Sequence, residues 1–234
     1  AETFDRLGKI AGDRVEALTL LAEGGTVGVL LRASVEASLL VLRRRDMSSL
    51  GRVFTGSIIN GVAAPAACPG AMVPAGWQAG EARGRIMVGI DEPDVSAEAL
   101  DLAFDLAQER GATVTVLHAW RAPMFYDDVI FARTSEQTWH EAARLRLQET
   151  VAPWAERYGD VTVEVVVEYE RPATALARAS SDSDVLVVGR RTRALPRGLA
   201  LGSVTSALIR TTACPLVVAP HPGDAEPTAA EETS

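Results

Sequence analysis

The sequence predicts an α/β protein with a doubly wound, parallel, five-stranded sheet, and two features of residues 85–219 carry this prediction. Five short apolar runs alternate with segments in which apolar residues recur at helical spacing. This alternation is typical of parallel strands that are covered by helices on both faces of a sheet. In addition, Asp91, His118 and Gly189 each end one of the runs, and doubly wound sheets bind ligands beyond the carboxyl ends of their strands.

Local signals define each element in turn. The five predicted strands are residues 85–91, 113–118, 161–169, 184–189 and 214–219. The four predicted helices run from a cap at Ser96 to Gly111, from Thr134 to about Tyr158, from Pro172 to Ser180 and from Ser203 to Thr211. Thr134 and Gln137 have the spacing of a capping box, and Pro172 suits the first turn of a helix. Residues 121–133 are a predicted loop.

The chain also contains an internal repeat at a constant offset. Gly56-Ser57 lies 146 residues before Gly202-Ser203 (202 − 56). The same offset relates Arg32-Ala33-Ser34 to Arg178-Ala179-Ser180, Leu40 to Leu186, Cys68-Pro69 to Cys214-Pro215, and Pro74 to Pro220. Five matches in one register indicate a tandem repeat. Because the second copy begins near Arg85, the first copy has no counterpart of residues 85–146.

This repeat divides the chain into three parts. Residues 1–80 are a predicted partial domain without its first strands, residues 85–220 a complete domain, and residues 221–234 a disordered tail rich in Pro, Ala and Glu. Truncation of the chain and natural loss of the segment are both compatible with the incomplete first copy.

Composition excludes several classes of protein. The net charge of −8 argues against a general nucleic-acid binder, whose binding face is usually basic. No apolar run is long enough for a membrane span, so no membrane association is expected. The two cysteines are too few for a disulfide framework, which favours a reducing cytoplasmic setting. Because Lys9 is the only lysine, residues 10–234 contain no Walker-type phosphate loop and no Schiff-base lysine.

A glycine-containing segment follows the fourth predicted strand. It reads Gly189-Arg190-Arg191-Thr192, then nine residues, then Gly202-Ser203. This segment resembles the nucleotide-binding loop of the universal stress protein family, in which the same spacing separates two glycines and a Gly-Ser or Gly-Thr pair. Glycine allows the backbone to approach a phosphate closely, and the free N–H groups at a helix start attract anions. The resemblance covers residues 85–220 and implies an adenine nucleotide α-hydrolase-like fold that binds ATP or another adenine nucleotide.

The resemblance also implies which residues form the site. Ile90, Val114 and Val188 would line the adenine pocket, and Asp91 would contact the ribose or a bound magnesium ion. The residues implied around the phosphates are Gly189, Arg191, Thr192, Gly202, Ser203, Val204 and Thr205. Two positions depart from the family pattern, since Thr192 replaces the second glycine and Glu92-Pro93 replaces a Gly-Ser pair.

The corresponding positions of the first copy do not predict a second site. They are Arg43, Asp46, Gly56 and Ser57, so both loop glycines are absent. A structural role is the better interpretation. The resemblance implies pairing across last strands, so residues 71–74 are expected to pair with residues 216–219 within one chain. The missing strands leave an open sheet edge, which predicts a homodimer.

Some residues keep two interpretations. Arg190, Arg191, Arg193 and Arg197 form a basic loop that either screens phosphate charge or is simply solvated. For His118, a half-buried histidine with an ordinary hydrogen-bond partner is favoured over nucleotide contact. Cys68 and Cys214 precede buried strands, where a thiol usually acts as a small apolar group.

We therefore predict an ATP-binding regulatory module of the stress response, with no catalytic residues. Two alternatives stay open. The first is a dimerisation scaffold that binds no nucleotide. The second is a slow ATPase, in which Asp91 and a metal ion support weak hydrolysis by analogy with the fold alone.

Overall fold

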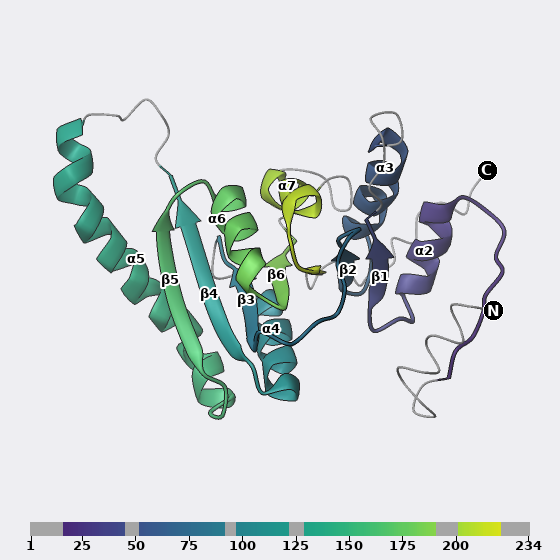
Figure 1. The fold of residues 1–234 in the computed structure, drawn as a ribbon, viewed down its shortest axis with the longest axis horizontal. Coiled ribbons are helices and arrows are strands. Elements are labelled where there is room, and N and C mark those ends of the chain that lie inside the picture. Colours follow the sequence, from purple (N-terminus) through teal and green to yellow (C-terminus); the bar gives the residue numbers. More distant parts are fainter. Residues whose placement is uncertain (1–15, 45–51, 92–96, 122–128, 191–200, 221–234) are drawn as a thin grey trace, which may run out of the picture.

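The computed structural model describes residues 16–44, 52–91, 97–121, 129–190 and 201–220. Its centre is a seven-stranded sheet with the order β1-β2-β7-β6-β3-β4-β5 (Figure 1). The strands are β1 Leu40–Arg43, β2 Gly70–Val73, β3 Arg85–Gly89, β4 Thr113–Trp120, β5 Val163–Tyr169, β6 Val185–Gly189 and β7 Leu216–Ala219. All neighbouring strands are parallel except β2 and β7. The predicted α/β fold with a mostly parallel sheet is confirmed, although the sheet gains two strands from the N-terminal half.

Helices cover both faces of this sheet. They are α2 Thr26–Ser34, α3 Arg52–Ala63, α4 Ala97–Arg110, α5 Val129–Arg157, α6 Pro172–Ala179 and α7 Ser203–Thr211, with a short 3₁₀ turn at Ser180–Asp182. Buried side chains of α4 and α5 share one apolar core with β3, β4 and β6. Those of α3, α6 and α7 share a second core with the opposite face of the sheet. This two-sided cover is the doubly wound arrangement.

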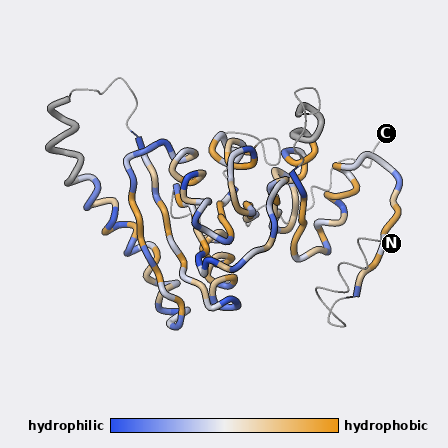
Figure 2. The backbone as a smooth tube through the Cα atoms, viewed as in Figure 1, coloured by the Kyte–Doolittle hydropathy of each residue, from blue (hydrophilic) through white to orange (hydrophobic). Residues whose placement is uncertain are grey.

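The central strands are apolar along their whole length. Every residue of β7 is buried, as are four of the five residues of β6, and Figure 2 shows these strands as hydrophobic. A strand that is covered on both faces has no solvent-facing side, so the sequence does not alternate between apolar and polar residues. At the sheet edge, β5 alternates more and carries Glu164 and Glu168, and charged residues of this kind protect an edge from unwanted pairing.

Most predicted boundaries agree with the structure. Gly111, with φ of +61°, ends α4, Pro172 is at the first turn of α6, and α7 has the predicted bounds. The largest difference is that α5 begins at Val129 rather than Thr134. β4 continues two residues further, to Trp120, whereas β3, β5 and β7 are each two residues shorter than predicted. Residues 129–133 contain no Gly or Pro, so nothing local stops the helix from extending beyond the capping-box signal. The proposed Ser96 cap and the 221–234 tail lie outside the described residues.

The two halves of the chain join through their last strands. β2 pairs antiparallel with β7, with Ala71 opposite Val217. This confirms the predicted pairing of residues 71–74 with residues 216–219. It also explains why the sheet is longer than the five strands expected for one domain.

Hydrogen bonds recur at the offset of 146 residues. Leu40 pairs with Gly70, and Leu186 pairs with Leu216, so β1–β2 and β6–β7 have the same register. The Ser34 hydroxyl accepts a hydrogen bond from the Ala67 N–H at 3.0 Å. The Ser180 hydroxyl accepts the equivalent bond from the Ala213 N–H at 2.9 Å. These matches support the interpretation of residues 26–74 as a repeat of residues 172–220.

Candidate functional site

The carboxyl ends of the central strands meet at one edge of the sheet. Gly89, at the end of β3, lies between Leu117 of β4 and Val188 of β6. The strand order changes direction at β3, because the chain adds β4 and β5 on one side of it and β6 and β7 on the other. Such a switch point is where doubly wound sheets bind ligands. Asp91 directly follows this edge, as the sequence predicted.

His118 fixes the backbone beside Asp91. Its Nδ1 lies 2.9 Å from the Ile90 carbonyl oxygen. A carbonyl oxygen only accepts hydrogen bonds, so Nδ1 donates to it. The Ile90 N–H in turn donates to the Leu117 carbonyl at 3.0 Å. The favoured interpretation of His118 as a half-buried histidine with an ordinary partner is confirmed.

Asp91 is exposed. Within the described ranges, no group of three or more His, Cys, Asp and Glu side chains is placed to hold a metal ion. Magnesium usually retains several waters and binds through one or two carboxylates together with substrate phosphates. Asp91 is the carboxylate that the sequence predicts for such a site.

The start of α7 supplies a second element of the site. Gly202 has an extended backbone (φ −56°, ψ 155°), and its carbonyl accepts the first bond of the helix, from the Ser206 N–H at 2.9 Å. The N–H groups of the first helical turn have no acceptor within a helix, and the helix dipole makes this end attractive to anions. Ser203 is exposed, whereas Val204 is half-buried and Thr205 is buried. Of the two predicted hydroxyl donors, the Ser203 side chain is therefore the accessible one.

One predicted pocket residue does not lie at this edge. Val114 is near the beginning of β4, in register with Ile86, and its side chain is fully buried in the core with α4. The prediction was wrong because β4 runs on to Trp120, so its carboxyl end is formed by His118, Ala119 and Trp120. Counting back from the end of the strand, rather than forward from its start, would have identified these residues. Ile90 and Val188, by contrast, do lie close to the edge and are buried.

Arg190 points away from solvent. Only 4% of its surface is exposed, and its Nη2 donates to the Ala66 carbonyl of the N-terminal half at 2.9 Å. The solvated interpretation of the basic loop is therefore wrong for this residue. The other predicted loop residues, Arg191, Thr192, Arg193 and Arg197, lie outside the described residues.

In the described part of the N-terminal half, the equivalent Gly-Ser pair is not at a helix start. Gly56-Ser57 lies within α3, which begins at Arg52, so this pair does not present a free helix terminus. Arg43 donates to the Ala75 carbonyl at 2.6 Å, and Asp46 lies outside the described residues. That this half carries no nucleotide site stays a prediction.

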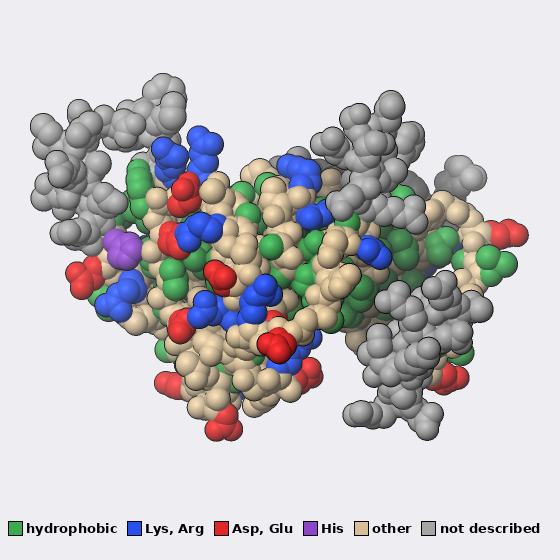
Figure 3. Space-filling model, in the orientation of Figure 1, with side chains coloured by type: hydrophobic (Ala, Val, Ile, Leu, Met, Phe, Trp, Pro, Cys, Tyr) green, Lys and Arg blue, Asp and Glu red, His purple; other side chains and the backbone are tan. Residues whose placement is uncertain are grey.

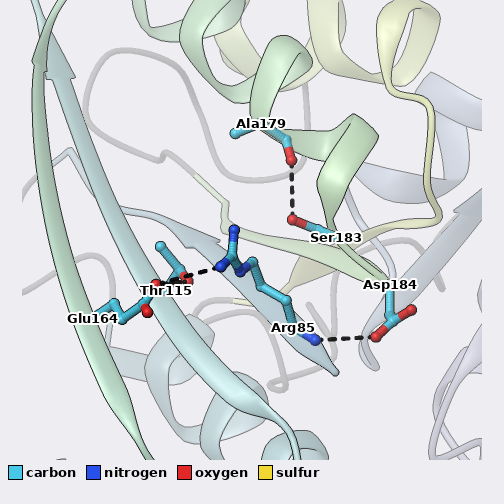
Figure 4. Close-up of polar contacts among 6 residues, drawn as sticks. All are labelled: Arg85, Thr115, Glu164, Ala179, Ser183 and Asp184. Carbon is cyan, nitrogen blue, oxygen red and sulfur yellow. Dashed lines mark hydrogen bonds and ion pairs between the residues drawn. The ribbon is translucent and has the colours of Figure 1, made fainter. Parts of the chain in front are cut away.

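At the opposite, amino-terminal end of the strands, the polar side chains bond one another (Figure 4). Asp184 accepts hydrogen bonds from the N–H groups of Arg83 and Arg85, at 2.8 and 3.1 Å. Glu164 lies 3.7 Å from the Arg85 guanidinium and accepts a bond from the Thr115 hydroxyl at 3.3 Å. This network anchors the beginnings of β3 and β6, so it has a structural role.

The two cysteines are poor nucleophiles. Burial raises the pKa of the Cys214 thiol to about 11. Burial also raises the pKa of Cys68, although backbone hydrogen bonds and the charge of Arg190 partly oppose the rise. Since the thiolate is the reactive form, both residues act as small apolar groups.

The fold and this edge define a doubly wound α/β protein with an anion-attracting helix start at its switch point. A model of the universal stress protein family matches residues 82–220. The chain therefore belongs to the universal stress protein family.

Curated relatives agree with this assignment. A universal stress protein of Mycobacterium tuberculosis is 32% identical over 195 residues, covering 82% of this chain and 65% of the relative. Another, from Mycolicibacterium smegmatis, is 32% identical over 215 residues, covering 92% of this chain and 71% of the relative. The chain thus spans about two thirds of the length of these relatives.

Solved structures show the same fold. A universal stress protein from Archaeoglobus fulgidus superposes with a TM-score of 0.66 at 18% identity, over 94% of this chain and 75% of that one. The protein UspA from Lactobacillus plantarum superposes with a TM-score of 0.50 at 20% identity, over 60% of this chain and 99% of that one. Among the helices of the described ranges, none has the length and apolar character needed to cross a membrane.

Proposed function

We propose that this chain binds ATP or another adenine nucleotide in its C-terminal half and acts as a regulatory module of the stress response. The observation that carries the proposal is the exposed start of α7, together with the sheet edge at which β6 ends with Gly189 and after which Asp91 lies. A negatively charged phosphate next to free N–H groups is stabilised without any basic side chain. Residues on both sides of the switch point would thus contact one ligand.

Each part of the nucleotide has a proposed contact. Ile90 and Val188 are the apolar residues next to the edge, where the base would lie. Asp91 is proposed to bind the ribose hydroxyls, or a magnesium ion that the phosphates also coordinate. Gly189, Gly202 and Ser203 are proposed to contact the phosphates. Arg191, Thr192, Val204 and Thr205 complete the proposed set.

Titration calorimetry with ATP and magnesium tests this proposal. Binding by the parent protein should be lost in Gly202→Val, because the added side chain obstructs the helix start. Gly80→Val is the matched control, since no atom lies within 4 Å of a Cβ built at Gly80. Absence of binding by the parent protein at millimolar ATP would refute the proposal and favour the scaffold alternative.

Slow hydrolysis of ATP is the second candidate function to be tested at the same site. Activity above a blank without protein that disappears in Asp91→Ala would show that the bound nucleotide is hydrolysed. Equal rates in both proteins would instead leave binding as the whole function of the site.

The N-terminal half supports a scaffold role. We propose that residues 26–74 are an incomplete copy of the domain and that β1 pairs with β1 of a second copy of this chain. Val41 of β1 is 63% exposed and the preceding Leu39 is 46% exposed, and the described residues place no strand on the outer side of β1. Exposed apolar residues on a sheet edge favour pairing with another chain, and the charged residue of β1, Arg43, is at the end of the strand and bonds the Ala75 carbonyl. Light scattering should then give a dimer mass that falls to the monomer mass in Val41→Glu, whereas a monomeric parent protein would contradict the proposal.

A further inference from the structure

Two equivalent arginines cross the boundary between the halves of the chain. Arg44 and Arg190 are separated by the repeat offset (190 − 44 = 146), and each directly follows a strand of the sheet. Their backbone N–H groups make equivalent bonds, from Arg44 to the Val73 carbonyl at 2.8 Å and from Arg190 to the Ala219 carbonyl at 3.1 Å. The two residues therefore have the same backbone position in their respective halves.

Their side chains make reciprocal contacts. The Arg44 guanidinium donates to the Ile209 carbonyl in the last turn of α7 at 2.9 Å. The Arg190 guanidinium donates to the carbonyl of Ala66, just beyond the end of α3, also at 2.9 Å. Carbonyl groups at helix ends lack intrahelical donors, and the helix dipole favours a cation there. Each half thus accepts a hydrogen bond from an arginine side chain of the other half.

The two contacts differ in their burial. Arg44 is half-buried, whereas Arg190 is buried. A buried guanidinium is costly unless it is hydrogen-bonded, so the Ala66 contact restricts where the Arg190 side chain can lie. Since Arg190 is bonded through both its backbone and its side chain, the residue directly after Gly189 is held in place from two sides.

We propose that Arg190 is a positioning residue through which the N-terminal half orients the nucleotide site of the C-terminal half. By donating to the Ala66 carbonyl, Arg190 fixes the backbone at Gly189, next to the proposed phosphate contacts. This inference rests on the proposed nucleotide function. The incomplete first copy would then have a role beyond pairing, because its Ala66 carbonyl accepts the hydrogen bond that fixes the backbone at Gly189.

Calorimetry of ATP with magnesium on matched variants tests the proposal. Arg190→Met should weaken ATP binding by about tenfold or more. Arg44→Met removes the reciprocal contact, which is made to the last turn of α7 and not to its first turn, so it should lower the melting temperature but change the ATP affinity by less than about twofold. Equal losses of affinity in the two variants, or none in either, would overturn the proposal.

A second pair of variants separates positioning from direct contact between Arg190 and phosphate. Ser34 accepts from the Ala67 N–H, next to Ala66, and it belongs to the N-terminal half. Ser34→Ala should therefore weaken ATP binding by about threefold, while the equivalent variant Ser180→Ala should not. If Arg190→Met weakens binding and Ser34→Ala does not, direct contact is the better explanation and the positioning role fails.

Hydrogen exchange separates this inference from the proposed function itself. If the parent protein binds no adenine nucleotide, the proposed function fails whatever the role of Arg190. The positioning role still predicts faster amide exchange at residues 188–190 in Arg190→Met than in Arg44→Met. Unchanged exchange at these residues would refute it independently of any ligand.

Discussion

The strand pair β1–β2 and the strand pair β6–β7 have the same register, yet they lie in different environments. Val187 of β6 is fully buried, whereas Val41, at the equivalent position of β1, is 63% exposed. β3 pairs with β6, and α4 contributes to the core that contains Val187. The described part of the N-terminal half provides no counterpart of either element. Figure 3 shows hydrophobic side chains at the surface over β1 and α2. Equivalent sequences thus formed equivalent hydrogen bonds without acquiring equivalent burial.

The largest expected difference between the two pairs concerns a buried charge. Val187→Asp should reduce the free energy of unfolding by about 3–5 kcal/mol, because an unpaired carboxylate would be placed in the core. In the single chain, Val41→Asp should change it by no more than about 0.5 kcal/mol, as is usual for exposed positions, and any larger cost would measure the proposed pairing of β1 with a second copy. Urea unfolding of both variants measures the difference. Similar losses would mean that Val41 is covered in solution, for example by a second copy.

The two equivalent cysteines should respond differently to alkaline pH. The thiol in an unfolded chain ionises near pH 9, whereas burial raises the pKa of Cys214 to about 11 in the folded protein. The folded state therefore holds this proton more tightly, so its stability is fully present below pH 9 and decreases as the pH rises towards 11. The expected loss is about 2 kcal/mol.

Urea unfolding at several pH values tests this expectation. Cys214→Ala should remove this part of the pH dependence. Cys68→Ala should remove less of it, because backbone hydrogen bonds and Arg190 oppose the rise in the pKa of Cys68. An identical pH profile in the parent protein and in Cys214→Ala would contradict the assignment.

The smallest expected difference between the two halves concerns two equivalent serines, whose replacement should cost the same stability. The hydroxyl groups of Ser34 and Ser180 donate to the Leu31 and Ala177 carbonyls, at 2.7 and 2.6 Å. Each hydroxyl also accepts from a backbone N–H, as described above. Replacing either serine by alanine should cost about 1–2 kcal/mol, because each change removes both the hydrogen bond that the hydroxyl donates and the one that it accepts. Thermal unfolding of both variants measures the costs, and a difference of several kcal/mol would show that the repeated bonds are not energetically equivalent.

Prediction from the sequence succeeded where the signal was local or came from the family resemblance. The apolar runs of β3, β6 and β7 identified buried parallel strands, and the resemblance identified the strands that join the two halves. It failed for Val114, because the pocket edge depends on where β4 ends rather than where it begins. It also failed for Arg190, whose partner Ala66 is 124 residues away in the chain. A basic loop has the same composition whether it faces solvent or the other half of the protein.

The sequence by itself determined where the chain turns and which segments become strands and helices. Gly111 adopts a positive φ that favours glycine, and Pro172 has a fixed φ that suits a helix start. Only the tertiary structure decided that Val187 is buried while Val41 is exposed, and that Arg190 contacts Ala66. The reason is that backbone conformation depends on neighbours in the chain, whereas burial and side-chain partners depend on which distant elements pack alongside.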